Sequence, residues 1–239
     1  MTEAPCPEQN HLLAEIPEHS KSRVFQSLRL VELKLGDVIY ESDQPIEFVY
    51  FPTNCIISLL YVMRSGASAE ISVIGNEGLV GVSVVLGGSS TPNRAIVQSS
   101  GYAYQMPVAE LEQEFNASAD LRVLTLRYTQ ALITQMSQTA VCNRHHSIDQ
   151  QLCRWLLLSL DRLQGNQLDM TQELIANMLG VRREGVTEAA RKLQKLGIIQ
   201  YKRGHIKVID RKRLEEMSCE CYDVVKRETE RLRYQKIGS

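Results

Sequence analysis

The chain has 239 residues, of which 44% are hydrophobic and 23% charged, with a formal net charge of −1. This length and composition predict one or two folded domains with a buried core. No apolar run reaches the roughly 18 residues of a membrane-spanning helix, and the polar N-terminus lacks the pattern of a secretory signal. The six cysteines form no CxxC pair, which favours reduced thiols and a cytoplasmic location.

Charge is distributed unevenly along the chain. Residues 1–143 hold 8 Lys and Arg against 15 Asp and Glu, whereas residues 144–239 hold 19 against 13. The C-terminal part can therefore attract phosphate groups, while the N-terminal part would be repelled by them.

The first part of the chain has the pattern of a small antiparallel β-domain. Residues 11–29 are predicted to be helical. From Leu30 to Pro107, short apolar segments alternate with turns such as Gly75-Asn76-Glu77-Gly78. Many short strands at regular spacing predict a barrel or sandwich. We expect residues 1–115 to form this domain, with a short helix over residues 108–115.

A long helix is predicted next, because Asp120 to Cys142 contain neither glycine nor proline. Its apolar stripe suits packing against a symmetric copy of itself, as in a coiled coil. The alternative is a helix that packs on its own barrel. We expect residues 116–146 to be a dimerisation helix and hinge. The expected dimer stripe is Leu121, Leu124, Tyr128, Leu132 and Met136.

Residues 147–239 have the pattern of a winged helix-turn-helix. After a helix over residues 149–163 and a loop over residues 164–167, helices are predicted at 171–178 and 182–196, with Gly180 in the turn. The second helix of such a motif enters the major groove of DNA.

Two short strands, at residues 198–201 and 206–209, are then predicted to be joined by Lys202-Arg203-Gly204-His205. Cations at the tip of this hairpin suit contact with DNA phosphates. The alternative for it is a solvated surface turn. A charged helical extension is predicted over residues 211–234.

Barrel, long helix and winged helix in this order resemble the cAMP receptor protein/FNR (Crp/Fnr) family of bacterial transcription regulators. The resemblance covers about residues 12–210, and its most specific part is Thr171 to Val186. It implies an α+β fold with a cyclic-nucleotide-binding-like, cupin-type β-barrel. It also implies a homodimer that binds a palindromic double-stranded operator, with RNA polymerase as a candidate partner and no membrane.

The resemblance also implies roles for individual residues. Arginine pairs with guanine and glutamate accepts from cytosine, and Glu188 stands where the family has a further base-reading arginine. We therefore expect an operator that differs from the one the cAMP receptor protein prefers. The expected base-reading residues are Arg182, Arg183, Glu184, Thr187 and Glu188. The expected phosphate contacts are Thr171, Arg191, Lys202 and Arg203.

The expected effector pocket departs from the cyclic-nucleotide pattern at Gly81, Val82, Asn93 and Arg94. Val82 replaces the glutamate that would bind a ribose, and losing that charged acceptor disfavours cAMP. Arg94 is displaced by one position; we expect it to pair with a barrel carboxylate rather than to hold an anion. The effector stays unknown, and no cofactor is assigned.

The cysteines and histidines leave a redox-, haem- or metal-responsive regulator as an alternative. An iron–sulfur cluster is disfavoured, because only Cys6 lies near the N-terminus. Near the hinge, Cys142, His145, His146 and Cys153 are close in sequence. Buried thiols and a hinge histidine pair are the simpler explanation, so no metal is assigned. On one helix, Cys219 and Cys221 would point about 200° apart, which predicts a poor chelate.

An enzyme is the weakest alternative. A cupin-type metalloenzyme places histidines inside its barrel, but residues 30–107 contain none, and no nucleophile motif is present. We therefore expect no catalytic residue. A third hypothesis gives the extension at residues 211–234 a structural or partner-docking role.

Overall fold

The computed structural model describes residues 4–163 and 165–234. Residues 1–3 of the predicted 1–115 domain, and residues 164 and 235–239 of the predicted 147–239 domain, lie outside the described residues. The N-terminal part combines short helices with two small sheets. Its elements are η1 (Pro7–Gln9), α1 (His11–Ala14), α2 (Glu18–Gln26), β1 (Arg29–Leu33), β2 (Val38–Tyr40), β3 (Phe48–Pro52), β4 (Ile56–Val62), β5 (Ser68–Ile74), η2 (Val82–Leu86), β6 (Arg94–Ser99), β7 (Gly101–Pro107) and α3 (Val108–Ala117).

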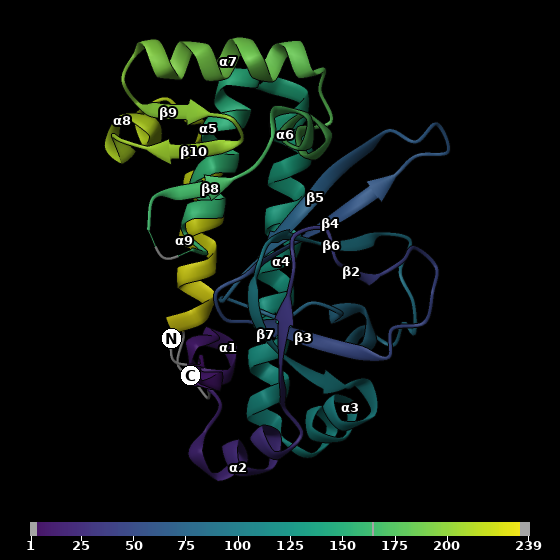
Figure 1. Cartoon of the computed structure of the whole chain (residues 1–239). Helices are drawn as coiled ribbons and strands as arrows, with labels where there is room; N and C mark the ends of the chain where they lie inside the picture. The colour runs from purple at the N-terminus through teal and green to yellow at the C-terminus, as the bar shows by residue number, and fades with distance from the viewer. Residues whose placement is uncertain (1–3, 164, 235–239) are drawn as a thin grey trace.

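The long helix α4 leads to the C-terminal part, most of which lies at one end of the molecule (Figure 1). Among the described residues, no helix combines the length and apolar character that crossing a bilayer requires. The elements are α4 (Ala119–His145), α5 (Ile148–Leu160), β8 (Gln167–Asp169), α6 (Gln172–Leu179), α7 (Arg183–Lys195), β9 (Ile199–Lys202), β10 (His205–Val208), α8 (Arg211–Glu216) and α9 (Glu220–Tyr234).

The strands of the N-terminal part form two antiparallel sheets, in the orders β1-β7-β3 and β2-β6-β4-β5. An isolated bridge joins Tyr50 to Val80. The expectation of a barrel is therefore corrected to a two-sheet arrangement that does not close. The sheets enclose one apolar core, because alternate residues of each strand point inward. That core includes Val49, Phe51 and Ile57.

The predicted helix over residues 11–29 is divided. Proline cannot donate a backbone hydrogen bond, and Pro17 precedes the first residue of α2. Residues 29–33 then pair with β7. Asn10 begins α1 by accepting from the backbone of Leu12 and Leu13, and its amide donates to Pro52 and Gly78.

Helix α4 has 27 residues, so it is about 40 Å long. Ser118 caps its N-terminus. One face packs on the N-terminal core through Leu121, Leu124, Tyr128 and Leu132, all buried, with Met136 partly buried beside them. The stripe expected to contact a second copy is thus occupied within the chain.

The C-terminal part agrees with the expected helix order and adds a strand. Residues 167–169, of which 167 was expected in a loop, form β8 and pair with β10. The hairpin turn is tighter than expected, because Lys202 and His205 already pair. Only Arg203 and Gly204 turn, both with positive φ, as a two-residue hairpin loop requires.

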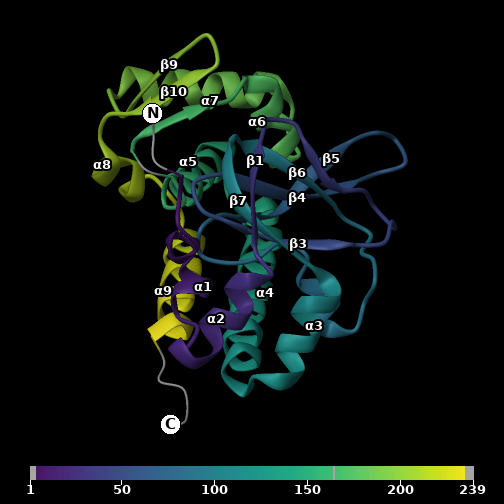
Figure 2. The ribbon, with the colours of Figure 1, turned by 60° about the horizontal axis from the view of Figure 1, so that its bottom comes forward.

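The predicted extension over residues 211–234 is two helices instead of one. Helix α8 ends at Glu216 and α9 begins at Glu220. Helix α9 lies along α4 in both views (Figures 1 and 2). At its end, Arg233 contacts α1 and the residue that follows it, with Nε 2.6 Å from an oxygen of Glu15 and Nη1 2.9 Å from Nδ1 of His11. This extension is therefore packed against its own chain.

Candidate nucleic-acid interface

Helices α6 and α7 form the helix-turn-helix, and each boundary has a local cause. The Thr171 side chain accepts from the backbone N–H of Leu174 and so caps α6. Gly180 ends α6 in the left-handed conformation, with φ 65°, which glycine adopts without strain. Arg182 precedes α7 in extended conformation. The sharp turn at Gly180 sets α7 across the outer end of the molecule (Figure 1).

Helix α7 is strongly two-sided. Val186, Ala189, Ala190 and Leu193 are buried against the core of the C-terminal part. The opposite face leaves side chains exposed to solvent. They include Arg182, Arg183, Glu184, Glu188 and Arg191.

Among the expected base-reading residues, Thr187 makes side-chain hydrogen bonds within the chain. Its hydroxyl lies 2.7 Å from Oε1 of Gln172 and 3.0 Å from the carbonyl oxygen of Arg183. The side chain is half-buried. The contact with Gln172 ties α7 to α6.

A hollow beside α7 brings together expected DNA contacts from three elements. Thr171 and Gln172 come from the start of α6, Arg183 from the start of α7, and Arg203 and Gly204 from the hairpin tip. The N-terminus of a helix and two guanidinium groups favour an anion. Tyr201 also lines the hollow and donates to the carbonyl of Met170 over 2.7 Å. The hollow can therefore hold a phosphate group.

The hairpin adds positive charge beside this hollow. Lys202 and Arg203 are exposed, as is Lys207 on β10. The imidazole of His205 lies beside Asp169 of β8, with Nδ1 2.6 Å from Oδ1. Arg203 lies in the two-residue turn itself, and Lys202 is the last residue of β9.

The expected effector region is arranged differently from a ribose-phosphate site. Gly81 begins η2 with φ 101°. Arg94 pairs with Glu41, with Nε 3.1 Å from Oε2, which confirms the expected pairing with a carboxylate of this domain. Asn93 accepts from the Tyr40 hydroxyl over 3.2 Å. Burial raises the pKa of Tyr40, so this hydroxyl stays a donor at neutral pH.

A buried polar network joins the sheet to the C-terminal part. The carboxyl group of Glu70 lies within hydrogen-bond distance of Ser58 (2.6 Å) and Trp155 (3.1 Å). Ser58 also lies 2.6 Å from Oε1 of Gln98, whose amide donates to Ser159 over 3.2 Å. Burial raises the pKa of Glu70 to about 7. The sequence analysis missed this network, because its members are far apart in the chain.

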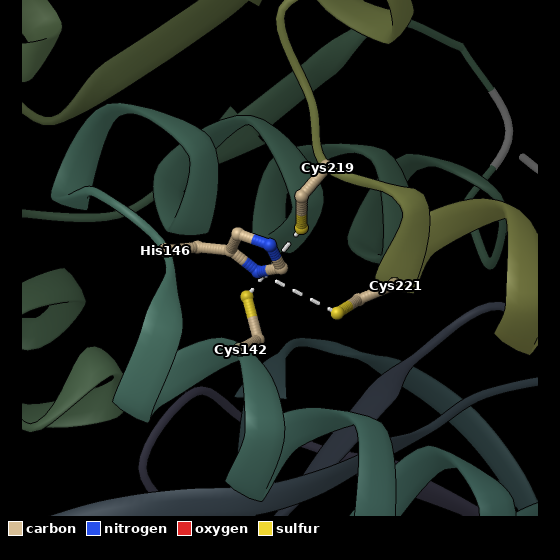
Figure 3. Close-up of side chains that lie close together, drawn as sticks. All are labelled: Cys142, His146, Cys219 and Cys221. Atoms are coloured by element: carbon tan, nitrogen blue, oxygen red, sulfur yellow. Dashed lines mark hydrogen bonds between the residues drawn. The ribbon is translucent and has the colours of Figure 1, made fainter.

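The cysteine cluster also differs from the expected one. The structure groups Cys142 and His146 with Cys219 and Cys221 (Figure 3). His145 is exposed, and Cys153 packs in the apolar core of the C-terminal part. Cys219 precedes α9 instead of lying on it, so the geometry that predicted a poor chelate does not apply.

Comparison with known proteins agrees with this geometry. Residues 150–217 match the family of Crp-like helix-turn-helix domains. No curated protein matches the chain at a significant level. Similar solved structures show the fold over nearly their whole length.

Three of these structures serve as references. A protein described as a Crp/Fnr-family transcriptional regulator from Eubacterium rectale has a TM-score of 0.68 at 19% identity, covering 88% of this chain and 98% of its own. FixK2 from Bradyrhizobium japonicum has a TM-score of 0.68 at 17% identity, and the match covers 80% of this chain and 98% of FixK2. The c-di-GMP responsive regulator CLP from Xanthomonas campestris has a TM-score of 0.64 at 13% identity, and the match covers 80% of this chain and 99% of CLP.

Proposed function

We propose that this chain acts as a transcription regulator of the Crp/Fnr type and that it reads a palindromic operator as a homodimer through the exposed face of α7. The observation that carries the proposal is the hollow that gathers Thr171, Arg183 and Arg203. A phosphate held there would fix the register of α7 in the major groove, since phosphate contacts position a protein on DNA.

The base-reading role belongs to the first two turns of α7. Arg182, Arg183 and Glu184 stand at its exposed start, with Glu188 one turn later and Thr187 beside them. Arg183 and Glu184 would read guanine and cytosine edges. Arg191, Lys202 and Arg203 would join Thr171 in contacting phosphates. The carboxylates of Glu184 and Glu188 can only accept hydrogen bonds, so the bases opposite them must offer amino groups.

The homodimer contact would lie on the side of α4 that faces away from the N-terminal core. Leu126, Ile133 and Ala140 are exposed at intervals of seven residues, and Gln130 and Ser137 alternate with them. This spacing of three and four residues is that of a coiled-coil seam. Leu126 and Ile133 are 44% and 57% exposed, and their burial by a second copy would stabilise a dimer.

The proposal divides the work among three segments of the chain. Residues 1–115 would sense an effector other than cAMP, residues 116–146 would dimerise, and residues 147–239 would bind DNA in the cytoplasm. The Glu70 network would pass the state of the sheet to α5. RNA polymerase would be the further partner at an activated promoter.

Selection of sites from a random pool of DNA duplexes, with the full chain and no added ligand, tests the proposal. A two-fold symmetric consensus is the expected result, with half-sites about one helical turn apart. Arg183→Ala is the matched variant, and it should lose the consensus while keeping salt-sensitive binding. Equal recovery of all sequences by both proteins would contradict specific reading.

A further inference from the structure

Three thiols and one imidazole converge where α4 ends, and the proposed function does not use them. Cys142 and His146 come from the last turn of α4 and the residue after it, whereas Cys219 lies between α8 and α9 and Cys221 lies in the first turn of α9. The four candidate ligand atoms lie within 4.8 Å of one another (Figure 3). Three of these side chains are buried in a cluster of their own, separate from both apolar cores.

Two of the distances between these atoms match those of a tetrahedral metal site. With metal–sulfur bonds of about 2.3 Å and metal–nitrogen bonds of about 2.0 Å, tetrahedral ligands lie roughly 3.8 Å apart for two sulfurs and roughly 3.5 Å for sulfur and nitrogen. Here the Sγ atoms of Cys142 and Cys219 are 3.6 Å apart, and Sγ of Cys221 is 3.6 Å from Nδ1 of His146.

The surroundings of the cluster are those of a metal site as well. Nε2 of His146 lies 3.4 Å from a carboxylate oxygen of Glu220, so Nδ1 is the nitrogen that faces the sulfurs. Histidine ligands commonly donate their second N–H to such a carboxylate. Three thiolates around a divalent ion leave one net negative charge, and the buried Arg154 guanidinium acts electrostatically on Cys142 and Cys221.

We propose that Cys142, His146, Cys219 and Cys221 bind one thiophilic divalent cation, Zn²⁺ by preference, in a closed tetrahedral site. Four protein ligands leave no open position, so the ion is structural and not catalytic. Thiolate and imidazole ligands select zinc-class ions over magnesium and calcium.

The bound ion would hold the hinge at the end of α4 in one conformation. His146 lies two residues before α5, the first helix of the C-terminal part, and Cys219 lies between α8 and α9. One ion would therefore join the end of α4 to the segment that follows the winged helix-turn-helix. Metal loading would fix the position of the C-terminal part relative to α4.

Metal analysis of the full chain, purified under reducing conditions, tests the proposal. The expected result is one zinc ion per chain, replaced by Co²⁺ with the intense visible bands of tetrahedral cobalt thiolate. Cys219→Ser and Cys221→Ser should each weaken Co²⁺ binding at least about tenfold, and Glu220→Gln by about tenfold. Cys55→Ser is the matched control, because Cys55 is buried elsewhere and donates to the carbonyl of Tyr102.

The outcome does not depend on the folding of any variant, since the wild-type chain alone gives the stoichiometry and the cobalt spectrum. A metal-free wild type that yields no thiolate bands with Co²⁺ would overturn the proposal. The proposal would also be overturned if anaerobically prepared protein contained a disulfide between Cys142 and Cys219 and still bound no Co²⁺ after that disulfide had been reduced. A symmetric DNA consensus with a metal-free cluster would leave the proposed function intact.

Discussion

Trp155 of α5 donates its indole N–H to Glu70 of β5, with Nε1 3.1 Å from Oε1. The first helix of the DNA-binding part is thus hydrogen bonded to the sheet that would sense an effector. Both side chains are buried, with 3% and 7% of their surface exposed. A buried carboxyl group in such a joint makes its strength depend on protonation.

Stability should fall as pH rises through the pKa of Glu70. The folded pKa of about 7 lies above the 4.5 of an ordinary glutamate side chain, so the folded state binds the proton more tightly. The stabilisation is complete below pH 4.5 and is lost as pH rises through about 7. We expect a loss on the order of 3 kcal/mol, measured by urea unfolding at a series of pH values.

Glu70→Gln should remove this pH-dependent component, because an amide keeps the acceptor for Trp155 and cannot ionise. Glu32→Gln changes an exposed carboxylate and should leave the wild-type profile. An unchanged pH profile in Glu70→Gln would exclude this role for the carboxyl group.

Gly78→Ala should destabilise the chain strongly. A Cβ atom at this position would lie 1.8 Å from Cε2 and 2.1 Å from Cζ of the Tyr128 ring. The ring is buried between α4 and the N-terminal core, so relief requires a backbone shift that costs about 1–3 kcal/mol or more.

The matched control for Gly78→Ala is Gly88→Ala, where the nearest atom to the added Cβ would be 3.4 Å away. We expect a change within about 0.5 kcal/mol there. Both values follow from thermal or urea unfolding. Equal stability of the two variants would rule out the close approach of the 75–78 turn to α4.

Lys202→Ala and Arg183→Ala should weaken DNA binding in different ways. Loss of a phosphate contact at Lys202 should weaken binding to all sequences and reduce the salt slope by about one. Arg183 lines the phosphate hollow as well, so Arg183→Ala should weaken binding to all sequences and, through loss of the base contact, cost about a further 1–3 kcal/mol on the selected operator. Fluorescence anisotropy over a range of salt concentrations measures both, and identical effects of the two variants would contradict the assignment.

Ile133→Glu should convert the dimer into a monomer. Ile133 is 57% exposed at the centre of the proposed seam on α4. In a symmetric dimer the substitution would bring two like-charged glutamates into this seam and remove its apolar contact. Sedimentation velocity measures the oligomeric state. Met63→Glu, at a similarly exposed apolar residue on the β4–β5 turn, should remain dimeric. A dimer that persists in Ile133→Glu would place the contact elsewhere.

Local patterns were sufficient to predict much of the fold. The helix-turn-helix was predictable because caps, the turn glycine and the apolar face of α7 all lie within residues 171–196. The long helix was predictable because a run without glycine or proline needs no tertiary information. Element boundaries moved where one residue decided them, as at Pro17.

Contacts between distant segments were not predictable. Either face of α4 carries apolar residues, and only the packing of the N-terminal core decides that Leu132 is inside and Ile133 outside. Cys142 and Cys219 are 77 positions apart, and spacing along a chain cannot show that the end of α4 meets the segment between α8 and α9. The open sheets were missed because short strands predict pairing but not closure.

The pairing of α9 with α4 has a consequence for synthesis. Glu15 and Arg233 are 218 positions apart, so this contact cannot form before residue 233 has been synthesised. Until then, one flank of α4 and the partners of Tyr222, Val225 and Leu232 stay uncovered. A message truncated before residue 220 would therefore yield a chain with a permanently exposed apolar surface, and such chains aggregate.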